Sequence, residues 1–154
     1  MNPPQPSILE LSKVQLHAMA DALLLGEAGA KETAIAFFEQ DSEGLWHNRA
    51  RAMIARRVKN IPITQKEKER LVEAVKVRLS TGKISEQFKD QLKMALFLDR
   101  TATIDCARLS LSSQKAHIVK YARWIIEHEK TEPNQHLRAT AQEKSGGEEG
   151  VSQR

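Results

Sequence analysis

The sequence predicts an all-α protein of about six amphipathic helices. From residue 7 to residue 130 the apolar residues recur at helical spacing, and no stretch alternates between apolar and polar residues as a half-buried strand does. Glycine and proline are the costliest residues inside a helix and are tolerated at its ends. In this region they occur only where the apolar pattern breaks, at Gly26, Gly29, Gly44, Pro62 and Gly82.

The chain of 154 residues, 40% of them hydrophobic, suits one domain. Residues 1–6 and 131–154 carry few large apolar side chains, so we expect a disordered N-terminus, a single helical domain over 7–130 and a disordered polar tail. No signal-peptide pattern and no membrane-spanning stretch are found, and the single cysteine, Cys106, excludes an internal disulfide. These features predict a cytoplasmic protein with no membrane partner.

The first two helices are predicted over 7–25 and 28–40. Ser7 and Glu10 have the spacing of a capping box, in which each side chain accepts a hydrogen bond from the other residue's backbone. Gly26 and Gly29 are placed in the turn before the second helix. Its predicted buried stripe consists of Ala30, Ala34, Phe37 and Phe38.

The third helix is predicted over 45–60 and ends before Pro62. Arg57 projects into its apolar side, where an unpaired charge is costly, so we expect an acid of the first two helices to pair with it. An anion site in a groove is the alternative. The candidate partners are Asp21, Glu32 and Glu39. The predicted apolar side consists of Trp46, Ala50, Met53, Ile54, Val58 and Ile61.

Three further helices complete the prediction. Thr64 and Glu67 form a second capping box at the start of a helix over 65–79, and Gly82 suits a left-handed residue after it. Ser85 is expected to cap the fifth helix, and the pattern leaves open whether that helix ends near residue 99 or continues towards 109. Ser112 or Ser113 is expected to cap a last helix that extends to residue 129.

Two of these helices share an apolar pattern at a spacing of 47 residues. The matching positions are Leu71, Val72, Val75 and Leu79 in one helix, and Ile118, Val119, Ala122 and Ile126 in the other. The spacing resembles that of HEAT and armadillo repeats, whose paired helices stack into a solenoid. The resemblance implies a short helical stack, with an antiparallel bundle as the alternative.

Charge is separated along the chain. Residues 1–48 carry two basic and seven acidic residues, whereas residues 49–83 carry eleven basic and three acidic ones. Arg49, Arg56 and Lys59 share an outer flank of the third helix, from which Arg51 points away, and we predict that this flank binds an acidic protein partner. The alternatives are a solvated face, pairing with the acidic first third of the same chain, and nucleic-acid binding by segment 49–83.

A second candidate surface is a stripe of aromatic residues on the last helix. His117, Tyr121, Trp124 and His128 fall on one side of it, and amphipathic rings of this kind anchor interfaces. Packing on the preceding helix is the alternative. The two histidines lie about 16 Å apart along the helix axis, too far for one metal ion.

The sequence thus predicts a non-catalytic protein-interaction or adaptor module without cofactor or metal. Its partner-binding residues are Arg49, Arg56, Lys59, His117, Tyr121, Trp124 and His128. A nucleic-acid-binding protein and a small enzyme with an unrecognised site are the alternative functions. Homo-oligomers are left open.

Overall fold

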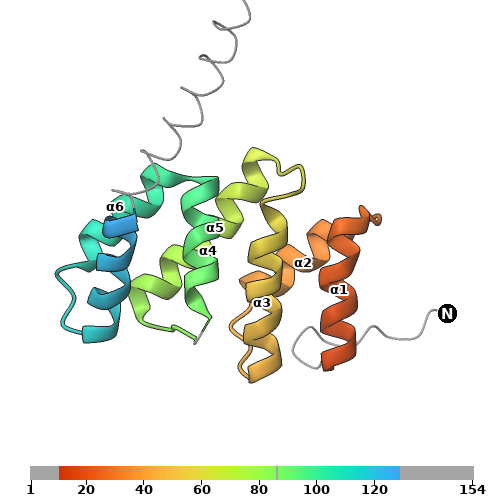
Figure 1. The fold of residues 1–154 in the computed structure, drawn as a ribbon, viewed down its shortest axis with the longest axis horizontal. Coiled ribbons are helices and arrows are strands. Elements are labelled where there is room, and N and C mark those ends of the chain that lie inside the picture. Colours follow the sequence, from red (N-terminus) through yellow and green to blue (C-terminus); the bar gives the residue numbers. More distant parts are fainter. Residues whose placement is uncertain (1–10, 86, 129–154) are drawn as a thin grey trace, which may run out of the picture.

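The computed structural model of the protein describes residues 11–85 and 87–128, in which every regular element is a helix (Figure 1). The predicted all-α fold is therefore confirmed. A further helix over 116–128 follows the six labelled ones. The labelled helices are α1 (Lys13–Leu25), α2 (Ala30–Glu39), α3 (Leu45–Val58), α4 (Gln65–Thr81), α5 (Phe88–Leu98) and α6 (Arg100–Ser110).

The helices form two layers. Helix α3 contacts both α1 and α5, and α4 contacts both α2 and α6, so alternate helices are neighbours (Figure 1). The 116–128 helix packs on α5, where the rings of Tyr121 and Phe88 meet edge to face at 5.6 Å. We call α1, α3, α5 and the 116–128 helix the front layer, and α2, α4 and α6 the rear layer.

The core lies between the layers and contains side chains from both. All four residues of the predicted stripe of α2 are buried, and Phe37 and Phe38 have no exposed surface. Phe88 and Leu92 of α5 contribute to the same core cluster from the front layer and are fully buried as well. Burying a large apolar side chain contributes about 1.5–3 kcal/mol, so this continuous core is the main stabilising contribution.

Capping boxes begin two of the helices. Thr64 and Glu67 form the predicted one, since Thr64 Oγ1 accepts from the Glu67 N–H (3.2 Å) and Glu67 Oε1 accepts from the Thr64 N–H (2.9 Å). The predicted start of the first helix is wrong, because residues 11 and 12 are not helical. A second box of the same type, Ser12 with Gln15, begins α1 instead. Ser7 and Glu10 lie outside the described residues.

The later helix ends differ in part from the prediction. Of the two alternatives left open for the fifth helix, an end near residue 99 is confirmed, because α5 ends at Leu98. Asp99 then caps α6 by accepting a hydrogen bond from the Ala102 N–H (3.1 Å). Ser85 does not cap α5, whose N-cap residue is Gln87. Of the two predicted serine caps, only Ser113 accepts a backbone hydrogen bond, from Lys115 (3.2 Å).

Among the side chains predicted on the apolar side of α3, the structure agrees with the prediction for Arg57 but not for Trp46. Arg57 pairs with Asp21 of α1, with 2.9 Å between Nη1 and Oδ1, as predicted from the cost of an unpaired charge. Trp46, by contrast, is not part of the buried side and is 37% exposed. It lies in the first turn of α3, where Lys13 and Arg49 cover its ring.

Both segments predicted to be disordered, 1–6 and 131–154, lie outside the described residues. Within residues 11–85 and 87–128, no helix combines the length and the apolar character required to cross a bilayer.

Replacing Gly82 with alanine should destabilise the fold more than the same change at Gly26. Both glycines are left-handed, with φ of 82° and 69°, and alanine is strained there by about 1 kcal/mol. A Cβ on Gly82 would also lie 2.7 Å from His117 Nε2, whereas nothing lies within 4 Å of one on Gly26. Urea unfolding should show an additional loss of about 0.5 kcal/mol for Gly82→Ala. Equal losses would contradict the contact between the α4 C-terminus and the 116–128 helix.

Candidate functional site

The predicted basic flank of α3 reaches the surface of the front layer. The Arg49 guanidinium lies 4.8 Å from the centre of the Trp46 ring, and Arg56 Nη1 lies 3.0 Å from Asp90 Oδ2 on α5. Lys59 follows the last turn of α3 and is half-buried. Two of the three predicted residues therefore lie along one exposed surface, and the third lies at its end.

The aromatic stripe makes contacts with several elements. His117 Nε2 lies 3.1 Å from the Gly82 carbonyl, and Tyr121 packs on Phe88. The Trp124 ring stacks on His128 with 4.8 Å between centroids. Tyr121 and Trp124 are half-buried against the core, so packing on the preceding helices, the alternative weighed from the sequence, describes much of their contact.

The flank and the stripe are connected through α5. Asp90 binds Arg56 on one side, and the neighbouring Lys89 lies 5.7 Å from the centre of the Trp124 ring on the other. The residues predicted separately on two helices therefore lie on the same surface, that of the front layer. Arg49 and Trp46 continue this surface towards α1.

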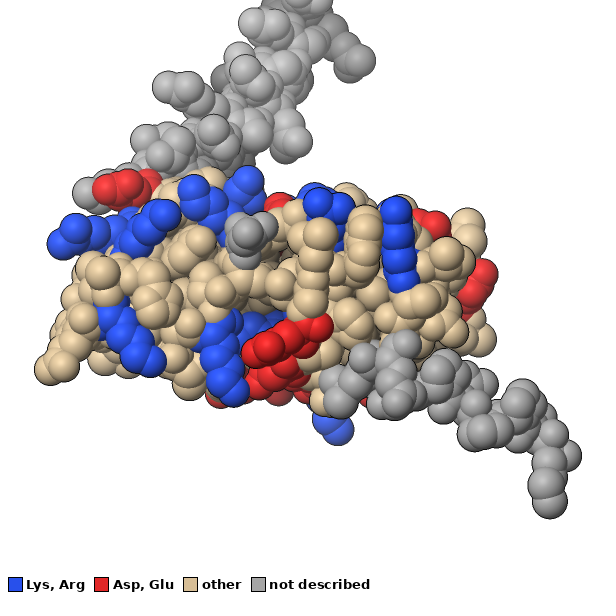
Figure 2. Space-filling model, turned by 90° about the horizontal axis from the view of Figure 1, so that it is seen from below, with Lys and Arg blue, Asp and Glu red and all other residues tan. Residues whose placement is uncertain are grey.

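The front layer carries most of the excess positive charge. Its helices hold nine basic and three acidic side chains, against eight and six in the rear layer. Figure 2 shows Lys and Arg side chains along the upper edge of the view, which corresponds to the near side of Figure 1. The basic residues of the front layer are Lys13, Arg49, Arg51, Arg56, Arg57, Lys89, Lys93, Lys120 and Arg123, of which only Arg51 is buried.

The basic segment 49–83 is divided between the two layers. Arg70 of α4 pairs with Glu32 and Glu39 of α2, and these carboxylates raise the pKa of Arg70 above its usual value. Lys31 pairs with Glu67 at 3.2 Å. Pairing of segment 49–83 with the acidic first third of the chain, one of the alternatives from the sequence, is therefore confirmed for Arg70. The Lys31–Glu67 pair has the opposite sense, because its base lies in the first third and its acid in segment 49–83.

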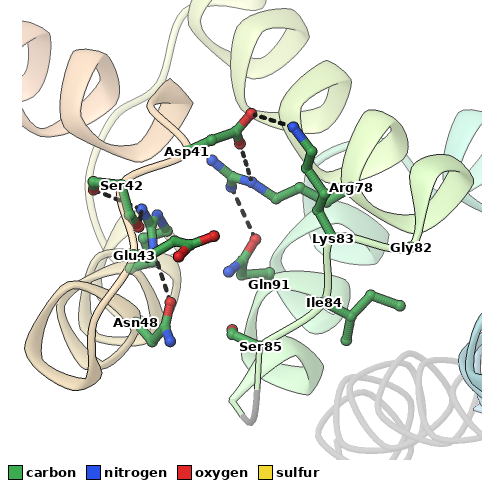
Figure 3. Close-up of a pocket in the computed structure, with 11 residues that line it drawn as sticks. Asp41, Ser42, Glu43, Asn48, Arg78, Gly82, Lys83, Ile84, Ser85 and Gln91 are labelled. Atoms are coloured by element: carbon green, nitrogen blue, oxygen red, sulfur yellow. Dashed lines mark hydrogen bonds and ion pairs between the residues drawn. The ribbon is translucent and has the colours of Figure 1, made fainter.

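A polar cavity of about 460 Å³ lies at the edge where α3 begins, between the α2–α3 connection and the α4–α5 connection (Figure 3). Figure 2 faces this edge of the molecule, and acidic and basic side chains meet near its centre. Two arginines that line the cavity, Arg51 and Arg78, are only 4% and 5% exposed. Buried arginines are rare unless they are paired or hydrogen-bonded, so both side chains need partners inside the protein.

Arg51 holds the connection that follows α2. Its Nη2 donates to the Gln40 carbonyl (3.1 Å), to the Ser42 carbonyl and to Ser42 Oγ (2.7 Å). Its Nη1 donates to Asn48 Oδ1 (2.9 Å). The Nε atom of Arg51 is buried and has no hydrogen-bond partner among the described residues.

Arg78 approaches the same connection from α4. Its Nη2 donates to the Phe38 carbonyl and to the Gln40 carbonyl (3.1 Å), and its Nη1 donates to Gln91 Oε1 (3.0 Å). Its Nε lies 3.7 Å from Asp41 Oδ1. Both arginines therefore bind carbonyl groups at the C-terminal end of α2, which have no partners within the helix and carry partial negative charge.

Burial and mutual repulsion perturb both guanidinium groups. Burial and, after it, the charge of Arg78 lower the pKa of Arg51 to about 10, while Asp41 opposes the shift. Burial also lowers the pKa of Arg78, against the attraction of Asp41 and Glu39. Two desolvated guanidinium groups therefore lie close to each other beside Asp41.

His47 fixes the other side of the connection. Its Nδ1 lies 2.7 Å from Ser42 Oγ, and the ring is buried against Phe37. Burial lowers the pKa of His47, followed by the charge of Arg51, whereas a hydrogen bond with the backbone of Leu11 raises it. Arg51 Nη2 donates to the same Ser42 oxygen, so His47 and Arg51 hold this hydroxyl group together.

Sequence reasoning missed both arginines of the cavity. It placed Arg51 away from the flank without assigning it a partner, and it did not single out Arg78. Arg78 falls on the buried side of α4, at helical spacing from Leu71 and Val75. That position signals a buried cation, in the same way as it did for Arg57.

In comparisons with known proteins, no family model, no curated protein and no solved structure matches this chain. Within the described part of the chain, no group of three or more His, Cys, Asp or Glu side chains is arranged to hold a metal ion.

Arg51→Met should destabilise the fold far more than Arg49→Met. The two residues lie on the same helix, but Arg51 is buried with four hydrogen bonds while Arg49 is exposed. Losing this network should cost about 2–3 kcal/mol, against less than about 1 kcal/mol for the exposed site. Chemical denaturation of the two variants measures the difference. Similar losses would show that the buried arginine does not hold the connection.

Glu67→Gln should destabilise the protein at neutral pH, and the loss of stability should shrink as the pH falls below 4.5. The hydrogen bond from the Thr64 backbone lowers the pKa of Glu67 below 4.5, and Lys31 lowers it further. A lowered carboxyl pKa contributes stability that is present above that ordinary value and is lost as the pH falls through the folded-state value. Glu69→Gln on the same helix is the control, and denaturation at several pH values is the measurement. A pH-independent difference would contradict the linkage.

Proposed function

We propose that this protein is a cytoplasmic, non-catalytic binding module whose front layer binds an acidic segment of a partner protein. The observation that carries the proposal is the charge of this layer, whose helices hold eight basic side chains that are not buried against three acidic ones. Trp46 and Trp124 lie within the same basic surface. Tryptophan and arginine are the side chains most enriched among those that dominate binding energies.

The basic side chains that cover the two tryptophan rings favour an acidic protein over a nucleic acid as the partner. Lys13 and Arg49 lie 4.2 and 4.8 Å from the centre of the Trp46 ring, and His128 and Lys89 lie against Trp124. Binding of unpaired nucleic acid depends on open aromatic faces on which bases stack. Cations held over these rings instead favour carboxylates, which bind the cations without displacing them.

Alternate helices are neighbours in the two layers, and this arrangement supports the short helical stack that the HEAT or armadillo resemblance implies. In such a stack each layer exposes one continuous face. Such a face suits an extended partner segment. Its basic charge should accelerate association with an acidic partner and make the affinity depend on salt.

Charge reversal tests the proposal directly. Arg49→Glu with Arg56→Glu should weaken binding of a fluorescent poly-glutamate peptide by at least about tenfold, because each change removes an attraction and adds a repulsion. Lys66→Glu with Lys68→Glu is the matched control, since it makes the same charge change within segment 49–83 but on the rear layer. Fluorescence polarisation at several salt concentrations measures both, and circular dichroism verifies folding.

Trp124→Ala should weaken the same peptide by a smaller factor, through loss of the ring that Lys89 covers. Equal weakening by the front and rear charge reversals would contradict the proposed surface. Tighter binding of a single-stranded DNA than of the peptide would transfer the proposal to the nucleic-acid alternative.

A further inference from the structure

The cavity beside α3 holds more cationic groups than the connection after α2 requires. Arg51, Arg78 and Lys83 all line it, and its carboxylates are Asp41 and Glu43 (Figure 3). Asp41 lies between two of the cations, 3.7 Å from Arg78 Nε and 3.6 Å from Lys83 Nζ. One carboxylate is thus shared between two cations at distances longer than a hydrogen bond.

One donor beside the cavity has no hydrogen-bond partner among the described residues. It is the Nε of Arg51, a residue with only 4% of its surface exposed. Leaving a buried charged donor without a partner costs at least about 1–3 kcal/mol. The positive charge of this guanidinium group is therefore only partly compensated beside the cavity.

We infer that this cavity binds the oxyanion group, a phosphate or a carboxylate, of a small polar molecule. Guanidinium groups present donors in a planar fork that matches these anions, and Lys83 adds a point charge at the mouth. Asn48, Ser85 and Gln91 line the remaining wall and offer hydrogen bonds to hydroxyl or amide groups. A volume of about 460 Å³ suits a small metabolite.

The structural bonds of the arginines are compatible with this role. Their terminal nitrogens hold the carbonyl groups of Phe38, Gln40 and Ser42, which fixes the two guanidinium planes. The Nε of Arg78 and the Nζ of Lys83 are not used in these bonds, and both lie beside Asp41 at the cavity. A site whose donors are already held in place loses less entropy when a ligand binds.

Asp41 acts as an internal competitor for the ligand. Its side chain is 55% exposed and lies on the connection between α2 and α3, so it can move away from the two cations. While the site is empty, Asp41 partly neutralises Arg78 and Lys83. A bound oxyanion would contact these cations in place of Asp41, and the negative charge of Asp41 would weaken its binding.

The test is a titration of the full chain with sodium phosphate and, separately, with sodium acetate, at an ionic strength held constant with sodium chloride. The Nε–H resonances of Arg51 and Arg78 in nitrogen-15 spectra report the site. We expect a saturable shift of both resonances. The anion that saturates at the lower concentration assigns the group as phosphate or carboxylate.

Two variants give opposite predictions that a purely structural ion pair would not produce. Lys83→Gln should weaken binding of the anion about fivefold, and Asp41→Asn should strengthen it by a similar factor. Lys66→Gln on α4 is the control, because it makes the same charge change at an exposed position outside the cavity. Its affinity should equal that of the wild type.

Absence of a saturable shift with either anion would overturn the inference. Equal weakening by Lys83→Gln and Lys66→Gln would overturn it as well, because the effect would then come from net charge. The outcome is separable from the proposed function, since none of the variants changes a residue of the front-layer helices.

Discussion

Arg51 and Arg78 hold the chain together where α2 ends, and the arrangement of both layers depends on them. They reach the same Gln40 carbonyl from α3 and from α4, one from each layer. The last carbonyl groups of α2 have no partners within the helix, and two buried cations supply the donors. Each of these hydrogen bonds thus offsets the cost of burying both the carbonyl group and the guanidinium group. Gln91 extends this network to α5.

The fold also separates the basic residues into two groups, one with acidic neighbours and one with few. Basic residues of the rear layer pair with carboxylates or carbonyl groups of the first third of the chain, as Arg70 and Arg78 do. Those on the front layer have few acidic neighbours. The exposed positive surface therefore results from which acids the fold places on the other side, and it is this imbalance that supports a partner of opposite charge.

Features that depend on neighbours along the chain were predictable, and those that depend on distant segments were not. Gly82 and the Thr64 capping box follow from local backbone chemistry, and the Arg57–Asp21 pair follows from the cost of a buried charge. The start of α1 was misplaced because Ser7 and Ser12 both begin a capping-box pattern. The cavity was missed because Gln40 and Arg78 are 38 residues apart, and nothing in either segment indicates that they meet. Helical spacing indicated only that Arg78 is buried.

The most direct measurement of this account is the exchange of guanidinium protons with solvent, resolved by residue in nitrogen-15 spectra. Because Arg51 and Arg78 are buried and hydrogen-bonded to carbonyl groups, their terminal protons should exchange far more slowly than those of Arg49 and Arg56 on the surface. Equally fast exchange for all four arginines would show that the two cations are not enclosed, and the contact on which the layers depend would be absent.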